Sequence, residues 1–221
     1  MRKARIFALA LIALAAVSAI GATAASADEF TATRYPALVT GTNEFGFTDE
    51  GITTAGVVKC TNTTYTGTLK EKSTTLTLTR SSSGCTGFGF PATVEMNGCD
   101  YLFHVNGTTS TTGTADLVCP AGKEVTVVAK SGATVKCTLH TPSQSGLGTV
   151  TYSNIGSAGE TEEITVSGNI AGTHYTHTPG TGVGACTGGS GTTGTSNFKA
   201  TLTGEEESPG TSHIGLILSN V

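Results

Sequence analysis

The chain has 221 residues, with 12 basic and 16 acidic side chains, 30 glycines, six cysteines and no tryptophan. Its formal net charge is −4 with His neutral. This acidic balance argues against binding to nucleic acid or to an anionic membrane, because basic patches supply the attraction in both cases.

The first 27 residues have the order of a secretory signal peptide. A basic start precedes an apolar run over residues 6–20, and the small residues 25–27 provide a cleavage site before Asp28. An uncleaved membrane anchor is the alternative, but an anchor needs about 20 consecutive apolar residues, and this run is shorter. We therefore expect residues 1–27 to be removed and the mature protein, with a net charge of −7, to be secreted or held at the cell surface.

Short runs of alternating apolar and polar residues follow the leader, and no window has the spacing of an amphipathic helix. Thr, the most frequent residue, favours strands, whereas Gly favours turns. The predicted strands lie at residues 74–79, 99–105, 125–127, 135–139, 164–166, 198–202 and 214–218. Many short strands separated by turns indicate an antiparallel sandwich or barrel, and we expect an all-β, sandwich-like architecture.

A mature chain of this length could form one large sandwich or two small ones. The segment around Pro91 is the best candidate boundary. We expect an N-terminal β subdomain over residues 28–91 that packs against a C-terminal β subdomain over residues 92–221. The Gly-rich stretch 179–196 could be a flexible linker, but it contains Cys186, which favours a loop tethered to the core.

All six cysteines lie in the mature chain and are expected to form three disulfides. They are Cys60, Cys85, Cys99, Cys119, Cys137 and Cys186. Although six cysteines allow 15 pairings, a hairpin with its loop near Thr109 would place Cys99 opposite Cys119. A second hairpin that turns at Glu71-Lys72 would bring Cys60 near Cys85, and Cys137 and Cys186 remain. No two cysteines are closer than 14 positions, which disfavours a metal cluster or redox pair.

Several short motifs follow one another along the chain in a characteristic order. The motifs are Phe30-x-Ala32-x-x-Tyr35-Pro36-Ala37, Cys60, Cys85, Asn97-Gly98-Cys99-Asp100-Tyr101-Leu102-Phe103, Cys119-Pro120-Ala121-Gly122, Cys137 and Gln144-Ser145-Gly146-Leu147. This order resembles a group of uncharacterised secreted proteins that occur as multiple copies in some high-GC Gram-positive bacteria. The resemblance covers most of the mature chain and implies export and disulfides. The group has no established activity, so the resemblance implies no functional residue.

Candidate nucleophiles and metal ligands are few. The G-x-S-x-G motif of exported serine hydrolases is absent, and Ser190, between two glycines, is expected to be a loop residue. His174 and His177 form the one closely spaced histidine pair, and residues three apart on a strand point to opposite faces. We therefore expect exposed sheet histidines here rather than a zinc site.

Paired carboxylates are the other candidate chemistry, because a glycosidase needs two of them about 5–10 Å apart. The candidates are Asp49-Glu50, Asp100, Asp116, Glu160, Glu162, Glu163 and Glu205-Glu206-Glu207. The second hairpin places Asp100 and Asp116 on one face, which we expect to be an exposed surface. The absence of Trp disfavours sugar stacking, and no D-x-D-x-D-G calcium loop is present.

No residue is therefore predicted to be catalytic, cofactor-binding or metal-ligating, and no cofactor is expected. The favoured hypothesis is a non-catalytic exported β protein that is structural, adhesive or ligand-binding, with a cell-envelope component or a polysaccharide as candidate partner. The alternative is a secreted hydrolase, for example of glycans, whose carboxylates converge only in the fold. A third hypothesis is that the protein binds a partner by pairing an edge of its sheet with a strand of that partner.

Overall fold

The structure is a computed structural model that describes residues 28–43, 49–53, 56–106, 111–156, 162–182, 184, 186, 192–206 and 213–220. All regular elements in these ranges are β-strands. The predicted leader lies outside the described residues, as do Thr109, Glu160, Ser190 and Glu207. Within the described ranges, no helix is long and apolar enough to cross a membrane.

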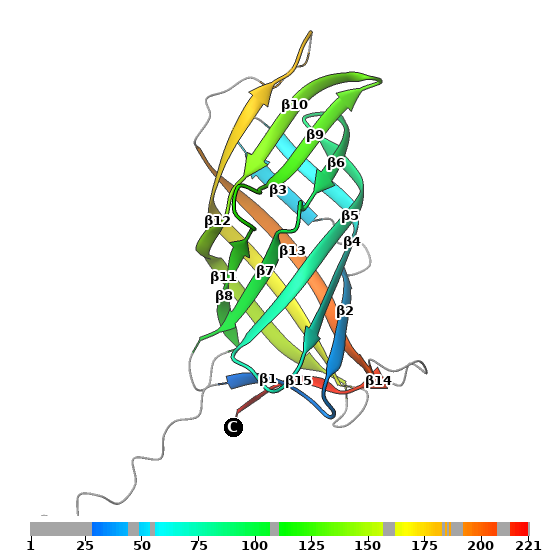
Figure 1. The fold of residues 1–221 in the computed structure, drawn as a ribbon, viewed down its shortest axis with the longest axis vertical. Coiled ribbons are helices and arrows are strands. Elements are labelled where there is room, and N and C mark those ends of the chain that lie inside the picture. The colour runs from blue at the N-terminus through cyan, green and yellow to red at the C-terminus, as the bar shows by residue number, and fades with distance from the viewer. Residues whose placement is uncertain are drawn as a thin grey trace, which may run out of the picture.

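Most strands belong to a single 13-stranded antiparallel sheet, which closes on itself into a tall cylinder (Figure 1). Four long strands run through both halves of the cylinder: β4 (Gly56–Leu69), β5 (Thr75–Gly87), β12 (Glu163–Pro179) and β13 (Thr192–Glu206). The lower half adds β2 (Ala37–Asn43), β7 (Asp100–Val105), β8 (Thr112–Val118) and β11 (Gln144–Ile155). The upper half adds β3 (Asp49–Thr53), β6 (Phe90–Glu95), β9 (Val125–Ser131) and β10 (Thr134–Thr141).

Each half is a closed ring of hydrogen-bonded strands. The lower ring runs β4-β5-β7-β8-β11-β12-β13-β2 and returns to β4. The upper ring runs β4-β5-β6-β9-β10-β12-β13-β3 and returns to β4. The sheet therefore encloses an interior along its whole height.

The predicted all-β class and antiparallel pairing are confirmed, but one closed sheet replaces the predicted sandwich. Alternation of apolar and polar residues could not separate the two architectures, because a strand buries one face in either of them. The expected boundary at Pro91 falls within β6. Strands from both sides of this position pair with each other in both rings.

Inward-facing apolar side chains fill most of the interior. The alternation predicted for Leu76 and Leu78 in β5, and for Ile164 and Val166 in β12, is confirmed, since all four side chains are buried. The threonines that alternate with the two leucines face solvent. β-Branched threonine suits this outer face because it favours an extended backbone while its hydroxyl stays hydrated.

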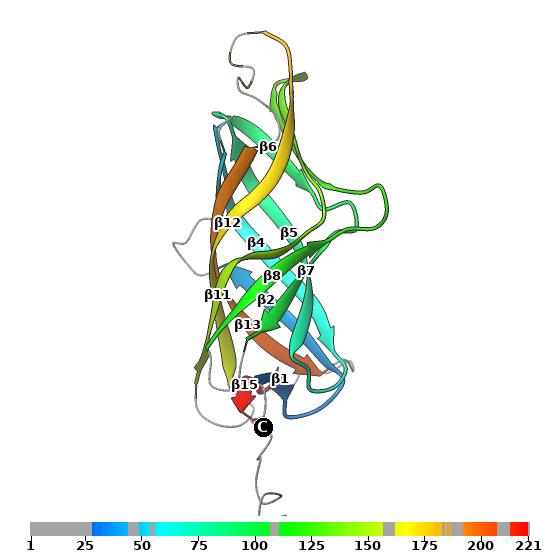
Figure 2. The ribbon, with the colours of Figure 1, turned by 90° about the vertical axis from the view of Figure 1, so that its left-hand side faces the viewer.

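On one side of the cylinder the short strands pass from one ring to the other at a common level, which we call the waist. The waist consists of the turn 96–99, which leads from β6 to β7, the segment 119–124, from β8 to β9, and residues 142–143, from β10 to β11 (Figure 2). Each crossing leaves a short stretch of a long strand without a neighbouring strand on that side.

Side-chain amides take the place of a neighbouring strand at one such stretch, on β12, and at a similar stretch of β4 between its pairings with β3 and β2. Gln144 donates from Nε2 to the carbonyl oxygen of His174 at 2.8 Å and accepts from the His174 amide at 2.7 Å. Asn43 does the same on β4, donating to the Thr61 carbonyl and accepting from the Thr63 amide, both at 3.0 Å. Buried or half-buried backbone groups need such partners, so these amides allow strands to change partners without opening the sheet.

The three predicted disulfides are confirmed. They are Cys60–Cys85, Cys99–Cys119 and Cys137–Cys186. The first joins directly opposed residues of β4 and β5, the second joins two waist segments, and the third fixes the chain after β12 to β10. Each bridge is worth about 2–4 kcal/mol in typical proteins. Three disulfides fit an oxidising compartment such as the cell exterior.

A two-stranded ribbon closes the lower end of the cylinder. It pairs β1 (Asp28–Ala32) with β15 (Leu216–Asn220), next to the short β14 (His213–Ile214) (Figure 1). Phe30 is fully buried, and its ring meets the ring of Tyr152 edge-on at a centroid distance of 5.4 Å. The beginning and the end of the described chain are thus joined in one lid.

Tyr152 should make the protein lose stability at alkaline pH. Burial raises the pKa of its phenol above the ordinary value. In the unfolded chain this phenol loses its proton near pH 10, so above that pH the folded state binds more protons and stability falls, by up to about 1.4 kcal/mol per pH unit. Denaturant titrations from pH 8 to 11.5 should show this slope, and Tyr152→Phe should reduce it. The exposed Tyr35→Phe is the control, and an equal slope in all three proteins would contradict the assignment.

Candidate functional site

The interior of the cylinder contains a partly open cavity of about 140 Å³ at the level of the waist. Apolar side chains from both rings line it: Val94, Val125 and Leu139 from the upper ring, and Phe103, Leu117 and Leu147 from the lower ring. These residues belong to the ends of the short strands, where the two rings meet. A closed ring of eight strands has an interior just wide enough for side chains or for one small ligand. Here the side chains leave room unfilled.

Three aromatic rings form a continuous wall on the lower side of the cavity. Tyr101 and Phe103 lie on one face of β7 with ring centroids 6.4 Å apart, and Phe103 and Phe198 of β13 lie 6.0 Å apart. These distances are typical of favourable tilted contacts between aromatic rings. The wall therefore offers a flat apolar molecule the same kind of contact.

Polar side chains of β4 and β5 line one side of the cavity. Arg80 is directly opposite Tyr65 across the strand pair, both residues line the cavity, and Arg80 Nε is buried. Glu50 also lines the cavity, but it is opposite Lys59 in the sheet and its carboxylate lies 3.4 Å from the exposed Lys59 ammonium. The described lining residues thus include two charged side chains, Arg80 and Glu50.

Gly51 leaves space in the lining on β3, the strand that pairs with β4. It lines the cavity, and a Cβ atom added there would meet no heavy atom within 4 Å. Its backbone is outside the left-handed region, so a larger residue would suffer no conformational strain. The cavity can therefore be filled by substitution at this one position.

Sequence reasoning missed the cavity residues, although one signal was present. Arg80 is two positions from Leu78 and four from Leu76, both on the inward face of β5. A charged residue in phase with buried leucines is a candidate for an interior polar site. Gly51 carried no such signal, because its role depends on what the neighbouring strands leave empty.

The predicted histidine pair points to opposite faces of the sheet. His174 is exposed, as expected, but His177 is 8 % exposed and lies opposite the buried Leu139. The expectation that both histidines would be exposed is therefore wrong for His177. A strand that closes the upper ring turns every second residue into the interior, and no local pattern around His177 indicates that the ring closes there.

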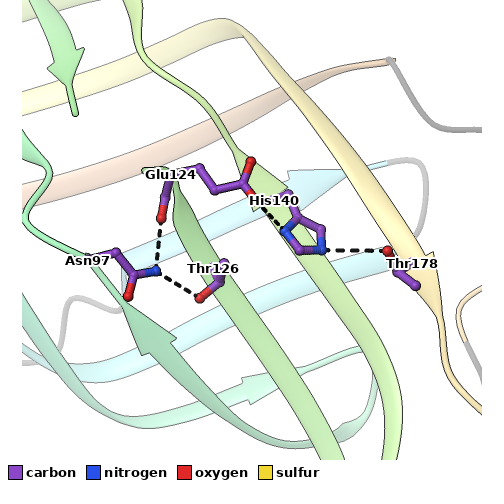
Figure 3. A network of polar contacts seen from close by, with 5 residues as sticks. All are labelled: Asn97, Glu124, Thr126, His140 and Thr178. Atoms are coloured by element: carbon purple, nitrogen blue, oxygen red, sulfur yellow. Dashed lines mark hydrogen bonds and ion pairs between the residues drawn. The ribbon is translucent and has the colours of Figure 1, made fainter. Parts of the chain in front are cut away.

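A carboxylate, an imidazole and a hydroxyl lie in series on the outside of the upper ring (Figure 3). Glu124 Oε1 is 2.6 Å from His140 Nδ1, and His140 Nε2 is 3.5 Å from Thr178 Oγ1. Asn97 donates from Nδ2 to the Glu124 carbonyl at 2.9 Å and to Thr126 Oγ1 at 3.3 Å. Nucleophile activation uses such a series, but none of these residues lines the cavity. The contacts link the start of β9 to β10 and β12, where the upper ring closes.

Asp100 and Asp116 lie on one face of the hairpin, as predicted, because Asp116 is opposite Leu102 and Asp100 lies two positions before Leu102. Asp100 Oδ1 accepts a hydrogen bond from Thr79 at 2.6 Å. Asp116 lies 2.9 Å from His104 Nε2 with one oxygen and accepts from the Gly146 amide at 2.7 Å with the other. Asp100 thus links β7 to β5, whereas Asp116 links β8 to both β7 and β11.

Other acidic candidates have separate partners as well. Glu206 pairs with Arg34, and Glu205 Oε1 accepts a hydrogen bond from Thr40 at 3.4 Å. Across the described part of the chain, no three His, Cys, Asp or Glu side chains gather into a group that could hold a metal ion.

Comparison with known proteins adds no further assignment. No protein-family model, no curated protein and no solved structure matches this chain.

Proposed function

We propose that this is an exported, non-catalytic β protein that binds a small apolar molecule in the cavity at its waist. The cavity is the observation that carries the proposal. Its volume of about 140 Å³ is close to that of an engineered apolar cavity of about 150 Å³ that takes up benzene or xenon. The ligand should therefore have a body about the size of one aromatic ring.

Ligand binding is favoured over the other hypotheses for physical reasons. A purely structural or adhesive protein gains nothing from an unfilled interior, since empty volume in a core lowers stability. Hydrolysis by paired carboxylates would need two acids to share one cleft, and among the described residues that line the cavity the one carboxylate is Glu50, which pairs with Lys59. The disulfides and the closed sheet suit a binding protein that must keep its shape outside the cell.

The proposal predicts that Gly51→Leu abolishes ligand binding without unfolding the protein, because the leucine side chain would occupy the cavity. The matched control is Thr93→Leu, which adds a leucine at an exposed position beside Val94. A ligand of this size is expected to bind the wild type with a dissociation constant of roughly micromolar to millimolar. Toluene can serve as the probe, with binding followed by calorimetry and by the shift in melting temperature.

Toluene should stabilise the wild type and Thr93→Leu but leave Gly51→Leu unchanged. The variant itself should melt at or above the wild-type temperature, because filling a void adds contacts. Equal binding by Gly51→Leu and the wild type would place the apolar site elsewhere. Absence of binding by the wild type to toluene, and to every other probe of this size, would overturn the proposed function.

A further inference from the structure

We propose that the ligand enters the cavity from the upper end of the cylinder and that the side chain of Phe88 is the gate on this route. This inference rests on the proposed function and adds the path by which the ligand reaches its site. Phe88 and Gly89 form the two-residue turn that joins β5 to β6, at the upper end of the long strand β5 (Figure 1).

The ring of Phe88 lies next to the upper lining of the cavity. It is half-buried and packs against Val127, Leu139 and Tyr175, all of which line the cavity. The same ring contacts the apolar cluster around the Cys137–Cys186 bridge, which fixes the chain after β12 to β10. Phe88 is not itself among the described residues that line the cavity. Its side chain therefore lies between the lining and the upper end of the cylinder.

Phe88 has a backbone conformation that aromatic residues rarely adopt. Its φ is 57° and that of Gly89 is 85°, both in the left-handed region. Two-residue hairpin turns with two positive φ angles favour Asn-Gly, Asp-Gly or Gly-Gly, and a bulky residue there is an outlier. The chain has the favoured pair in Asn97-Gly98, with φ of 54° and 83°. Strained residues cluster at ligand clamps and switch regions, so the outlier points to a role for the ring itself.

The contacts of Phe88 fix its backbone more firmly than its ring. The Phe88 amide donates to the Val57 carbonyl oxygen at 3.0 Å. The ring has room because residue 56 is glycine, where an added Cβ atom would lie 2.9 Å from Phe88 Cδ1. On the other side of the turn, a Cβ atom added at Gly89 would meet no heavy atom within 4 Å. Because apolar contacts hold the ring, it can rotate aside without breaking a hydrogen bond.

The lower end of the cylinder is packed more deeply than the upper end. The largest apolar cluster fills the lower ring and extends to the ribbon of β1 and β15, with Phe30, Val150 and Ile164 fully buried in it. A ligand from this side would have to displace several close-packed layers. The two apolar clusters of the upper ring are smaller, and Phe88 contacts both. Movement of this one side chain therefore opens the less obstructed path.

The test measures how fast fluorobenzene exchanges with the cavity, by fluorine NMR on the oxidised protein. Phe88→Asn removes the ring and gives the turn the residue that forms the same conformation at Asn97. It should raise both the association rate and the dissociation rate by about tenfold, because a gate limits passage in both directions. The dissociation constant should change by less than about threefold, since Phe88 lies outside the lining.

A conservative variant covers the case in which Phe88→Asn does not fold. Phe88→Leu keeps an apolar side chain against both upper clusters, and it should raise the two rates by a smaller factor. The controls are Phe30→Ala, which removes a ring from the lower lid, and Gln144→Ala, which removes the amide that bonds to the His174 backbone at the waist. Both controls should exchange fluorobenzene at the wild-type rates.

The outcomes separate the gate from the binding site. Wild-type exchange rates in both Phe88 variants would overturn the gate and leave the proposed function in place. Faster exchange in Phe30→Ala or Gln144→Ala, with none at Phe88, would put the entrance at the lower lid or the waist and overturn the inference. A change in the dissociation rate alone would mean that the ring contacts the ligand, which also overturns it. Absence of binding of fluorobenzene and toluene to the wild type would overturn the proposed function as well.

Discussion

Gly113→Ala is expected to cause one of the largest losses of stability of any single substitution in this chain. Gly113 of β8 is buried and pairs with Val105 on one side and Val150 on the other. An added Cβ atom would lie 1.8 Å from the carbonyl oxygen of His104 and 2.9 Å from Cε2 of Tyr152. Because the nearer atom belongs to the backbone, no side-chain rotation can relieve the clash, and the strands β7 and β8 must separate.

The expected cost is at or above the upper end of the range of about 1–3 kcal/mol found for overpacked cores. Denaturant unfolding at pH 7 measures it, with the disulfides intact. Gly51→Ala is a matched control, since it is the same substitution in a strand of the same sheet, at a site where the added atom meets nothing within 4 Å. It should be neutral or stabilise by up to about 1 kcal/mol.

Gly113→Ala and Gly51→Ala together test whether neighbouring strands approach the backbone closely at Gly113 but not at Gly51. A loss at Gly113 no larger than the change at Gly51 would contradict the packing of β7 against β8 and Tyr152. A large loss at Gly51 would instead contradict the space on which the proposed binding site depends. Either result can be read without any ligand.

Several strands and two of the disulfides could be predicted from sequence because they follow from local pattern, and the third disulfide, Cys137–Cys186, followed by elimination. Leu76 and Leu78 alternate with threonines, and this alternation alone identifies a strand with one buried face. A hairpin with its loop near Thr109 places Cys99 opposite Cys119, and the structure has that register, with Phe103 opposite Ala115.

Closure of the sheet could not be predicted in the same way. It depends on pairings between distant segments, such as Leu139 with His177, and the sequence shows no local sign of them. The hydrogen bonds from the Gln144 side chain to the His174 backbone could not be predicted either. They are needed only because β10 ends near His174 and leaves that backbone without a neighbouring strand. The cavity follows from these same pairings, so its lining residues could not be grouped in advance.

The second large effect is expected at the lower lid, where Phe30→Ala should cost about 3–5 kcal/mol. The Phe30 side chain is fully buried against Tyr152, and its backbone exchanges hydrogen bonds of 2.8 and 3.1 Å with Ser73. Truncation to alanine removes the ring but keeps these backbone bonds, so the loss measures the packing of the lid alone. Denaturant unfolding of the oxidised protein gives the value.

Tyr35→Ala is the control, because it removes an aromatic side chain that is 40 % exposed and one hydrogen bond from the Ala32 amide. That change should cost no more than about 1.5 kcal/mol. If Phe30→Ala costs no more than the control, the ribbon of β1 and β15 does not seal the cylinder. Phe30 does not line the cavity, so the folded variant should still bind toluene with wild-type affinity. A parallel loss of binding would mean that the lid and the waist are coupled, and that the lower end of the cylinder helps to shape the binding site.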